Sequence, residues 1–455
     1  MKQSLRVFLG TFAITFVIYA VLRQDCFYRH DGWGFVNALE SGSEFGSAHP
    51  FYIPLARIWH SLLALTGIGT FRAAGLLSAF GSAIAVAIHA LSLRRLGQRD
   101  WVLGCAWVAL CPAVLFFASV IEIHGLFLAF ASLSFYLCVL LAEMRSLFVA
   151  ILLAVALAVA TGVHASGVLL PLLFLPWYLR KAREHLLLTT ATVMVVAILY
   201  LSIVWWLLPG GVATDASLPT ASDLIRESPR LLPVLWREWL LPFFPVSLLV
   251  VFALARRRWR VEAALLLLTL VPYVLTCVLL LQEAPEKGAY LLPWILPASL
   301  LALEMCGPWL GRVLVAAGAL LGLWTIQAHE TARGVDPGWA HHVEQACEGH
   351  SSYVLVWKDW EMDSLLLHAD STQVSPIWTP PFAAVTPETQ KYLLPRYEQM
   401  LGGKKRLLTY ECRVGMGQES TSLSGPMLLR FFVEQMGAVE LDARGQRQPA
   451  QRQPR

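Results

Sequence analysis

Residues 125–142 read GLFLAFASLSFYLCVLLA, a stretch of eighteen residues without a charge. Its length and hydrophobicity are typical of a helix that spans a membrane, which needs about 20 mainly apolar residues. Similar stretches recur along the chain and predict eleven spans, at 6–22, 73–93, 101–118, 125–142, 147–162, 164–179, 187–208, 239–255, 263–281, 290–306 and 311–328. We therefore expect an all-α polytopic membrane protein.

The composition of the whole chain favours the same class. Of the 455 residues, 57% are hydrophobic and 15% are charged, and the mean hydropathy is +0.59, whereas soluble domains carry roughly 25% charged residues. The net charge is +4 and the basic residues are scattered in short loops, so the basic surface of a nucleic-acid-binding protein is missing. The expected partner is a lipid bilayer, with no nucleic acid.

Charges that flank the spans predict the orientation. Lys2 and Arg6 precede the first span, and no small-residue cleavage site follows it, which is typical of an uncleaved signal anchor. Basic residues are enriched in cytoplasmic loops. If the chain crosses the membrane alternately from a cytoplasmic N-terminus, every second loop between spans is cytoplasmic. These loops contain Arg94, Arg95, Arg99, Arg145, Arg180, Lys181, Arg183, Arg256, Arg257, Arg258 and Arg260. This pattern predicts a cytoplasmic N-terminus and an outside C-terminus, and without a retention signal it favours a bacterial inner membrane.

The composition changes along the chain and predicts three regions. Residues 1–328 form the multi-pass domain, whose first outside loop at 23–72 includes interfacial helices. Residues 329–442 have the composition of a soluble domain on the outer face, and 443–455 lack large apolar residues and are expected to be disordered. Within the soluble domain we expect strands at 353–357, 373–378 and 406–411 and a short helix at 363–368. These elements predict a small α/β or α+β fold.

Two cysteines lie in this outside domain, Cys347 and Cys412. If the outside is periplasmic, they could form a disulfide that stabilises the domain. The sequence leaves the free thiols as an equal alternative, because connectivity does not follow from spacing.

Asp31, in the first outside loop, is the candidate catalytic residue. It lies about nine residues beyond the first span, and Gly32 and Gly34 next to it permit close approach of the backbone to a ligand. A carboxylate at a membrane surface could accept the proton of a hydroxyl acceptor as a general base, or it could coordinate a divalent metal. It could instead only cap the helix expected at 32–41.

Ionisable side chains also occur at the outside ends of later spans, where their cost favours a functional role. Glu122 and His124 form a Glu-x-His pair at a tight turn, and His164 opens the sixth span. Lys287, in the short loop 282–289, carries an ammonium that could bind a lipid phosphate. A surface carboxylate, a packed histidine and a solvated turn are the corresponding structural alternatives. No Walker, GxGxxG, CxxC or HExxH motif occurs in the chain, so soluble nucleotide and zinc enzymes are not supported.

Taken together, these residues resemble the membrane glycosyltransferases of the GT-C superfamily, closest to the protein O-mannosyltransferase-like branch and its uncharacterised bacterial relatives. That branch has an Asp, Gly and Phe and then a His-Pro in the first loop, a Glu-x-aromatic pair at the next outside turn, and a Tyr-Leu-x-Pro start to a late span. The matching residues are Asp31, Gly34, Phe35, His49, Pro50, Pro54, Glu122, His124 and Tyr290 to Pro293. The chain departs from the branch at Phe51-Tyr52-Ile53, where Pro-Gly-Tyr is expected, and at His124, where an aromatic ring is usual.

The resemblance implies an enzyme that moves a sugar from a polyprenyl-phosphate donor to an extracytoplasmic acceptor, which could be a protein hydroxyl, a lipid or a glycan. It implies direct displacement with inversion, an active site on the periplasmic face, and Asp31 as base or acceptor-orienting carboxylate. The implied substrate- and carrier-binding residues are His30, His49, Arg57, Glu122, His124, His164, Lys287 and Tyr290. No cofactor is certain; Mg²⁺ or Mn²⁺ at Asp31 and Glu122 stays open.

Two other functions remain as alternatives. One is a transporter or flippase of a lipid-linked or small substrate, a class that tends to show inverted repeats and polar groups in broken helices at mid-membrane depth. The sequence shows neither feature, because its ionisable residues cluster at the outside ends of the spans. The other alternative is a noncatalytic membrane scaffold, which predicts that Asp31→Asn leaves the function intact.

Overall fold

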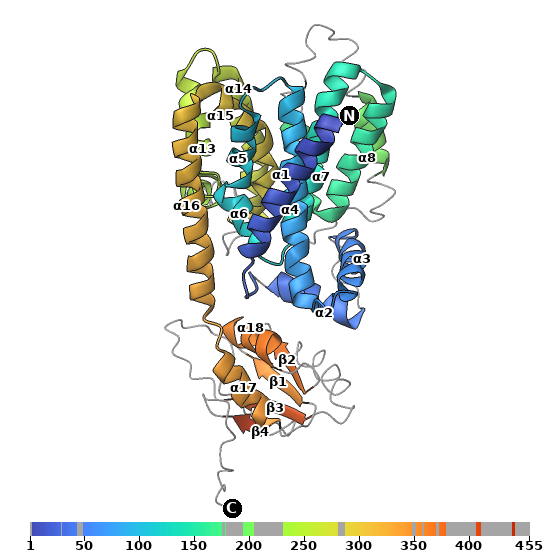
Figure 1. Ribbon diagram of the computed structural model, residues 1–455, viewed down its shortest axis with the longest axis vertical. Coiled ribbons are helices and arrows are strands. Elements are labelled where there is room, and N and C mark those ends of the chain that lie inside the picture. Colours follow the sequence, from blue (N-terminus) through green and yellow to red (C-terminus); the bar gives the residue numbers. More distant parts are fainter. Residues whose placement is uncertain are drawn as a thin grey trace, which may run out of the picture. The chain divides into compact units, whose positions relative to one another are not determined.

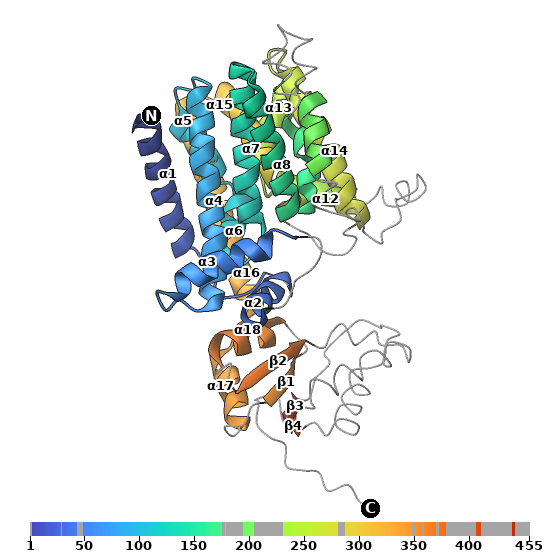
Figure 2. The same ribbon diagram turned by 90° about the vertical axis from the view of Figure 1, so that its right-hand side faces the viewer.

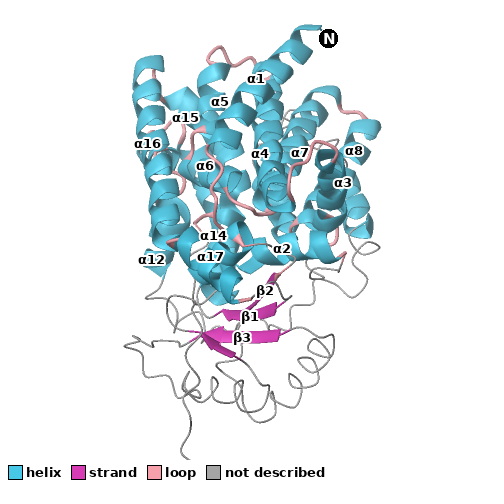
Figure 3. Ribbon diagram, turned by 60° about the horizontal axis from the view of Figure 1, so that its bottom comes forward, coloured by secondary structure: helices cyan, strands magenta, loops and turns pink. Residues whose placement is uncertain are grey.

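The computed structural model describes residues 2–28, 30–42, 49–174, 178, 194–203, 231–280, 287–347, 352–356, 359–369, 373–378, 406–410 and 439–441. The chain separates into two compact units, Met1–Ala328 and His329–Arg455. In the described residues, the first unit is built from helices and the second contains a sheet (Figure 3).

The first unit is a bundle of apolar helices with short 3-10 and π-helical segments. Its elements are α1 Lys2–Val21, α2 His30–Ser41, α3 Tyr52–Ala64, α4 Thr70–Arg95, α5 Trp101–Ala109, α6 Pro112–Ser119, α7 His124–Met144, α8 Leu147–Val163, the 3-10 helix η1 Ala165–Leu169, α12 Leu231–Val234, the π-helix η4 Leu235–Leu240, α13 Val246–Ala255, α14 Arg260–Leu280, the 3-10 helix η5 Ala289–Trp294, α15 Ile295–Met305 and α16 Pro308–Arg333.

Four helices among the described residues are long and apolar enough to cross a membrane. They are α1, α4, α7 and the helical segment Pro308–Ala346, whose first part is α16. They support the prediction of an integral membrane protein. The predicted span 101–118 is divided into α5 and α6, which are bent by 58° at the break before Pro112 and give a fifth crossing if they act as one span. Proline lacks the N–H that would continue the helix, which explains the break.

Other predicted spans are shorter or divided in the structure. The helical residues of 239–255 comprise the end of the π-helix and α13, and 290–306 is made of η5 and α15. The span 187–208 is described only over 194–203, which form a helix. The number of eleven spans therefore stays a prediction.

The centre of the bundle is the contact between α4 and α7 (Figures 1 and 2). Glycines bring the two backbones together, because a Cβ at Gly81 would lie 2.6 Å from the backbone of Gly125. A Cβ at Gly125 would in turn overlap the carbonyl of Ser78. Small residues allow this close packing where both helices face lipid-like surroundings. The α4–α7 contact fixes the position of the turn that precedes α7 along the axis of α4.

The helices α2 and α3 of the first outside loop lie at one end of the bundle, beside the start of α4 (Figure 2). Trp59 of α3 donates its indole N–H to the carbonyl of Ala73 in α4 at 2.9 Å. Before α2, Gln24 donates its backbone N–H to the Ser119 carbonyl at 2.8 Å and its side-chain amide to the Ser119 hydroxyl at 2.9 Å. These bonds hold the loop against the end of α6.

The second unit contains a four-stranded parallel sheet. Its elements are α17 Pro337–Ala346, β1 Ser352–Val356, α18 Asp359–His368, β2 Val374–Trp378, β3 Arg406–Tyr410 and β4 Val439–Leu441, and the strand order is β2-β1-β3-β4. Strands β1, β2 and β3 lie on the three segments predicted as strands, and α18 begins four residues before the predicted 363–368 helix. The parallel pairing, with α18 between β1 and β2, is the α/β arrangement.

Of the two cysteines predicted to form a disulfide, only Cys347 lies in the described residues. Cys347 is buried, and its thiol lies 3.4 Å from the carbonyl oxygen of Val343. Cys412 and the tail 443–455 lie outside the described residues, so the disulfide and the disorder of the tail stay predictions.

Candidate active site

The turn between α6 and α7 is held in place by a serine of α4. Ser78 donates its hydroxyl to the carbonyl of Glu122 at 2.8 Å, and the Glu122 N–H donates back to the Ser78 oxygen at 3.1 Å. Polar groups buried in a helical bundle need such partners. The two bonds fix the backbone at Glu122, which lies two residues before His124.

Five predicted site residues meet around this turn, and we call them the histidine cluster: His49, His124, His164, Glu122 and Tyr290. The His164 ring lies at its centre, with ring centroids 5.3 Å from His49, 5.0 Å from His124 and 5.1 Å from Tyr290. Three of these residues are buried: Glu122, His124 and His164 are only 4%, 5% and 4% exposed. Residues that are far apart in the sequence thus form one polar group, in which Glu122, His124 and His164 are buried and His49 and Tyr290 are partly exposed.

Hydrogen bonds assign opposite tautomers to two of these histidines. The Nδ1 atom of His164 accepts the backbone N–H of Ser166 at 3.2 Å, so in the neutral ring the proton is on Nε2. The Nδ1 atom of His49 lies 3.2 Å from the carbonyl of Val163, which can only accept, so this nitrogen carries the proton and Nε2 is left as the basic atom. The cluster therefore contains both a proton donor and a proton acceptor among its ring nitrogens.

Glu122 brings negative charge to the cluster at the start of α7. One carboxylate oxygen, Oε2, lies 3.9 Å from the Nε2 atom of His124 and accepts the N–H of Ile123 at 3.4 Å. The first N–H groups of a helix favour a negative charge at this end. A carboxylate placed here is suited to hold a histidine proton or a hydroxyl group of a ligand.

Lys287 reaches the same region through aromatic rings. Its Nζ atom lies 3.8 Å from the ring centroid of Phe116 and 5.3 Å from that of Tyr28. The Tyr28 ring packs edge-on against Phe117 at 5.7 Å, and Phe117 packs against His124 at 4.8 Å. A continuous set of rings therefore connects the ammonium group with the histidine cluster.

The backbone of Asp31 also lies beside the turn. His30 and Asp31 are the first two residues of α2, so Asp31 is not the residue before the helix that a capping role would require. A Cβ added to Gly32 would lie 3.0 Å from the carbonyl oxygen of Ile121. The first turn of α2 therefore packs against the residue that precedes Glu122. The side chains of His30 and Asp31 lie outside the described part of the structure.

Arg57 takes a different position. It lies in the middle of α3 and donates from Nη2 to the carbonyl of Gly42 at 2.7 Å. This bond ties α3 to the end of α2.

Sequence reasoning missed two site residues, Tyr52 and Glu238. Tyr52 begins α3, is 1% exposed, and its hydroxyl has no hydrogen-bond partner among the described residues. Burial and the negative charge of Glu122 both raise the pKa of this hydroxyl. Tyr52 directly follows the His49-Pro50-Phe51 segment, and this proximity was the available signal.

Glu238 is a buried carboxylate in the π-helix η4, and its Oε2 atom accepts the backbone N–H of Gly288 at 2.9 Å. It therefore contacts the residue that follows Lys287. An acid between two tryptophans in an apolar stretch, Trp236 and Trp239, was the signal in the sequence.

No group of three or more His, Cys, Asp or Glu side chains that could hold a metal ion occurs among the described side chains. The predicted metal ligands were Asp31 and Glu122, and the Asp31 side chain is not among those described. A divalent metal at Asp31 and Glu122 therefore stays a prediction.

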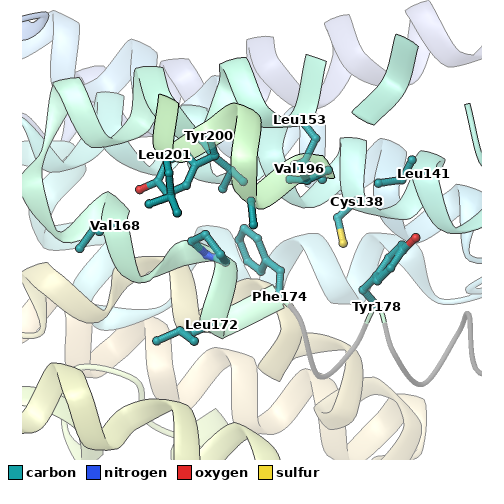
Figure 4. A pocket seen from close by; sticks show the side chains of 13 residues that line it. Cys138, Leu141, Leu153, Val168, Leu172, Phe174, Tyr178, Val196, Tyr200 and Leu201 are labelled. Atoms are coloured by element: carbon teal, nitrogen blue, oxygen red, sulfur yellow. The ribbon is translucent and has the colours of Figure 1, made fainter. Parts of the chain in front are cut away.

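An apolar cavity of about 320 Å³ lies between α7, α8, the segment 168–174 and the helix at 194–203 (Figure 4). Leu153, Phe174, Val196 and Leu201 are among the side chains around it. Tyr200, which also lines it, has its hydroxyl 2.9 Å from that of Thr161, three residues before His164. The cavity is thus adjacent to the segment that carries the histidine cluster.

Comparison with known proteins gives a limited likeness. No protein-family model matches the chain, and no curated protein matches it. Among solved structures, the crystal structure of ArnT from Cupriavidus metallidurans bound to undecaprenyl phosphate is similar, with a TM-score of 0.49, 13% identity, and coverage of 86% of this chain and 94% of that one. The apo structure of the same ArnT gives a TM-score of 0.46 and 12% identity over the same shares of the two chains. At this level the likeness does not assign a family or an activity to the chain.

Proposed function

We propose that this membrane protein is a glycosyltransferase of the GT-C type, which transfers a sugar from a polyprenyl-phosphate carrier to an acceptor outside the cytoplasm. The active site is the histidine cluster together with Lys287 and Asp31. The relation to the protein O-mannosyltransferase-like branch, the bacterial inner membrane and the periplasmic position of the site are parts of the same proposal.

The observation that carries the proposal is the position of the ionisable groups. Glu122, His124 and His164 meet at one end of an apolar bundle, beside the backbone of Asp31. Lys287 comes from a separate part of the chain and is connected with them through aromatic rings. Ionisable groups in apolar surroundings are costly, and their convergence favours a ligand that carries charge. A lipid phosphate with a sugar attached has its charge at the level of the headgroups and its chain in the hydrocarbon.

The chemistry requires a base, an acceptor site and a counter-charge for the leaving group. The acceptor hydroxyl gives its proton to the Asp31 carboxylate while its oxygen forms a bond with the anomeric carbon. The bond between that carbon and the phosphate oxygen breaks, and the electron pair remains on the lipid phosphate. The Lys287 ammonium stabilises this developing charge, and Glu122 and the histidines orient the sugar or acceptor hydroxyls. Attack and departure on opposite sides invert the anomeric centre.

The carrier chain needs an apolar surface that is continuous with the bilayer. The cavity of about 320 Å³ offers an apolar surface, and its lining residue Tyr200 bonds Thr161, three residues before His164. A cavity of this size lined by hydrocarbon suits part of an isoprenoid chain and not a whole carrier. It supports the choice of a lipid-linked donor over a soluble nucleotide sugar.

The first test is a binding measurement on the full-length protein in detergent. Native mass spectrometry compares polyprenyl phosphate with an ordinary phospholipid for the wild type, Lys287→Ala, Asp31→Asn and a control, Arg99→Ala, which removes an exposed cation at the other end of α4. We expect preferential retention of polyprenyl phosphate by the wild type. Lys287→Ala is expected to weaken it about tenfold, while Asp31→Asn and Arg99→Ala leave it unchanged.

Equal retention of polyprenyl phosphate and phospholipid by the wild type would contradict the donor assignment and favour the transporter or scaffold alternatives. Retained binding together with full transfer activity in Asp31→Asn would contradict the role of Asp31 while leaving the donor class intact.

A further inference from the structure

The loop that carries Lys287 has an unusual backbone. Lys287 has φ = 48° and Gly288 has φ = 80°, so two consecutive residues are in the left-handed region. Only one other non-glycine residue in the described part, Arg145, has a positive φ. This conformation is unfavourable for a residue with a Cβ and persists only where the surroundings enforce it. Something in the structure must therefore hold Lys287 in place.

Close packing around Gly288 supplies one part of that constraint. A Cβ at this position would lie 2.8 Å from the Phe243 ring, 2.9 Å from Pro242 and 3.0 Å from the carbonyl oxygen of Glu238. Only glycine combines the positive φ with this space. Gly288 thus packs tightly against the end of the π-helix η4 and the segment that joins it to α13.

The Glu238 carboxylate supplies the second part. It accepts a hydrogen bond from the Gly288 N–H at 2.9 Å, and Glu238 is only 4% exposed. A hydrogen bond to a buried charged acceptor is stronger than one between neutral groups. Glu238 lies in a π-helical turn in which Glu238 and Trp239 are buried while Trp236 and Arg237 are exposed. Such turns insert one extra residue and often redirect a side chain at a functional site.

We propose that Glu238 is the positioning residue that holds the Lys287 ammonium at the lipid-phosphate site. This inference rests on the proposed function, because it assumes that Lys287 binds the carrier phosphate. The carboxylate holds the peptide N–H that follows Lys287 and so fixes the left-handed turn. The fixed turn sends the lysine side chain to the Phe116 ring, 3.8 Å from Nζ, instead of into solvent. Without the carboxylate the turn relaxes and the ammonium leaves its place.

The test separates a positioning role from a purely structural one by measuring headgroup selectivity. Native mass spectrometry of the full-length protein gives the ratio of affinities for polyprenyl phosphate and for polyprenol of the same chain length. For Glu238→Ala we expect this ratio to fall about tenfold, nearly as far as for Lys287→Ala, with polyprenol binding unchanged. Glu238→Gln keeps an acceptor oxygen and is expected to keep most of the ratio.

A matched control comes from the same segment. Ser247 is buried and donates its hydroxyl to the carbonyl of Leu240, the last residue of the π-helix, at 2.8 Å. Ser247→Ala removes a buried hydrogen bond to this helix and keeps both Glu238 and Lys287. We expect it to lower the melting temperature and leave the selectivity ratio unchanged. If Glu238→Ala does not fold, Glu238→Met fills the same space without an acceptor oxygen and carries the same expectation.

The double variant Glu238→Ala/Lys287→Ala decides whether the carboxylate acts through the lysine. We expect the selectivity ratio of the double variant to equal that of Lys287→Ala alone, because Glu238 acts only through the Lys287 side chain, which is already absent. A selectivity ratio that falls in Lys287→Ala but not in Glu238→Ala would overturn the inference and leave the proposed function standing. A ratio unchanged in Lys287→Ala would instead overturn the role of Lys287 in the proposed function. Additive losses in the double variant would assign Glu238 an effect independent of Lys287 and would also overturn the inference.

Discussion

At the scale of single residues, Lys287 combines a useful side chain with an unfavourable backbone. Its ammonium lies over the Phe116 ring, and its φ of 48° is one that glycine adopts more readily. The position therefore sacrifices some stability to place a charge, which is common at functional sites.

Replacing Lys287 by glycine and by alanine separates these two effects. Both variants lack the ammonium, so both are expected to lose the preference for polyprenyl phosphate. Lys287→Gly is expected to be more stable than Lys287→Ala by about 1 kcal/mol, because alanine retains the cost of the left-handed region. Thermal unfolding in detergent measures the difference. Equal stability of the two variants would show that the turn is not maintained in the free protein.

Tyr52 presents a buried hydroxyl for which the described residues offer no hydrogen-bond partner. Removing such a group does not break a protein hydrogen bond, so Tyr52→Phe is expected to be as stable as the wild type or more stable by about 1 kcal/mol. If the hydroxyl binds a ligand, the same variant loses affinity for substrate. Chemical unfolding and substrate binding, measured on the same preparation, separate the two effects.

The raised pKa of Tyr52 also predicts a dependence of stability on pH. The folded protein holds the phenolic proton above the unfolded pKa of about 10. Below that pH both states are protonated and the contribution is constant. Above it the unfolded state loses the proton first, so stability falls as pH rises. The wild type is therefore expected to lose stability above pH about 10 more steeply than Tyr52→Phe. Parallel curves for the two proteins would contradict this assignment.

At the scale of secondary-structure elements, the contact between α4 and α7 sets the geometry of the site. The Gly81–Gly125 contact brings the two helices close enough for Ser78 to bond both backbone groups of Glu122. A larger residue at the crossing separates the helices and moves the turn that carries Glu122.

Gly125→Ala is expected to lower the free energy of unfolding by about 2 kcal/mol. The added Cβ would overlap backbone atoms of Ser78, and a backbone cannot relieve the overlap by changing a side-chain rotamer. The control is Gly10→Ala in α1, where nothing lies within 4 Å of the added Cβ. This control is expected to be neutral or stabilising by about 0.5 kcal/mol. Denaturant titration followed by far-UV circular dichroism measures both variants. Comparable losses in the two would indicate that the helix crossing is looser than the contact implies.

At the scale of the whole molecule, the polar site and the arginine-rich connection lie at opposite ends of α4. The helix begins at Thr70 beside α3 and ends with Arg94 and Arg95. Arg95 pairs with Glu143, near the end of α7, and so joins the ends of the two helices away from the histidine cluster. The positive-inside rule therefore predicts that the histidine cluster lies on the outer side of the membrane.

Cysteine labelling in intact cells tests this orientation. Gly69→Cys adds a thiol where nothing lies within 4 Å, next to the start of α4, and Arg99→Cys adds one in the exposed turn after its end. A membrane-impermeant maleimide is expected to label Gly69→Cys in intact cells and Arg99→Cys only after permeabilisation, each compared with the parent protein. The reverse pattern would invert the predicted orientation and place the site in the cytoplasm.

Local properties of the sequence determined the apolar helices and several members of the site. Hydrophobic stretches predict α1, α4, α7 and α8 almost to their ends, because a spanning helix satisfies its own backbone hydrogen bonds and needs only apolar side chains outside. The cost of charge near hydrocarbon likewise singled out Glu122, His124, His164 and Lys287 as separate candidates. These inferences depend on residues that are neighbours in the chain.

Only the tertiary structure decided which candidates meet. His49, His124, His164 and Tyr290 share one cluster because segments distant in the chain pack together. Ser78 holds the turn before His124, and the His49 segment bonds the end of α8, next to His164. Glu238 holds Gly288, two residues before Tyr290. Arg57, equally suited to bind phosphate by its chemistry, is directed to the Gly42 carbonyl. Glu238 and Gly288 are 50 residues apart, and their hydrogen bond depends on a π-helical turn for which the sequence has no periodic signal. Contacts between distant segments depend on packing, and hydrophobic periodicity records only which residues are buried.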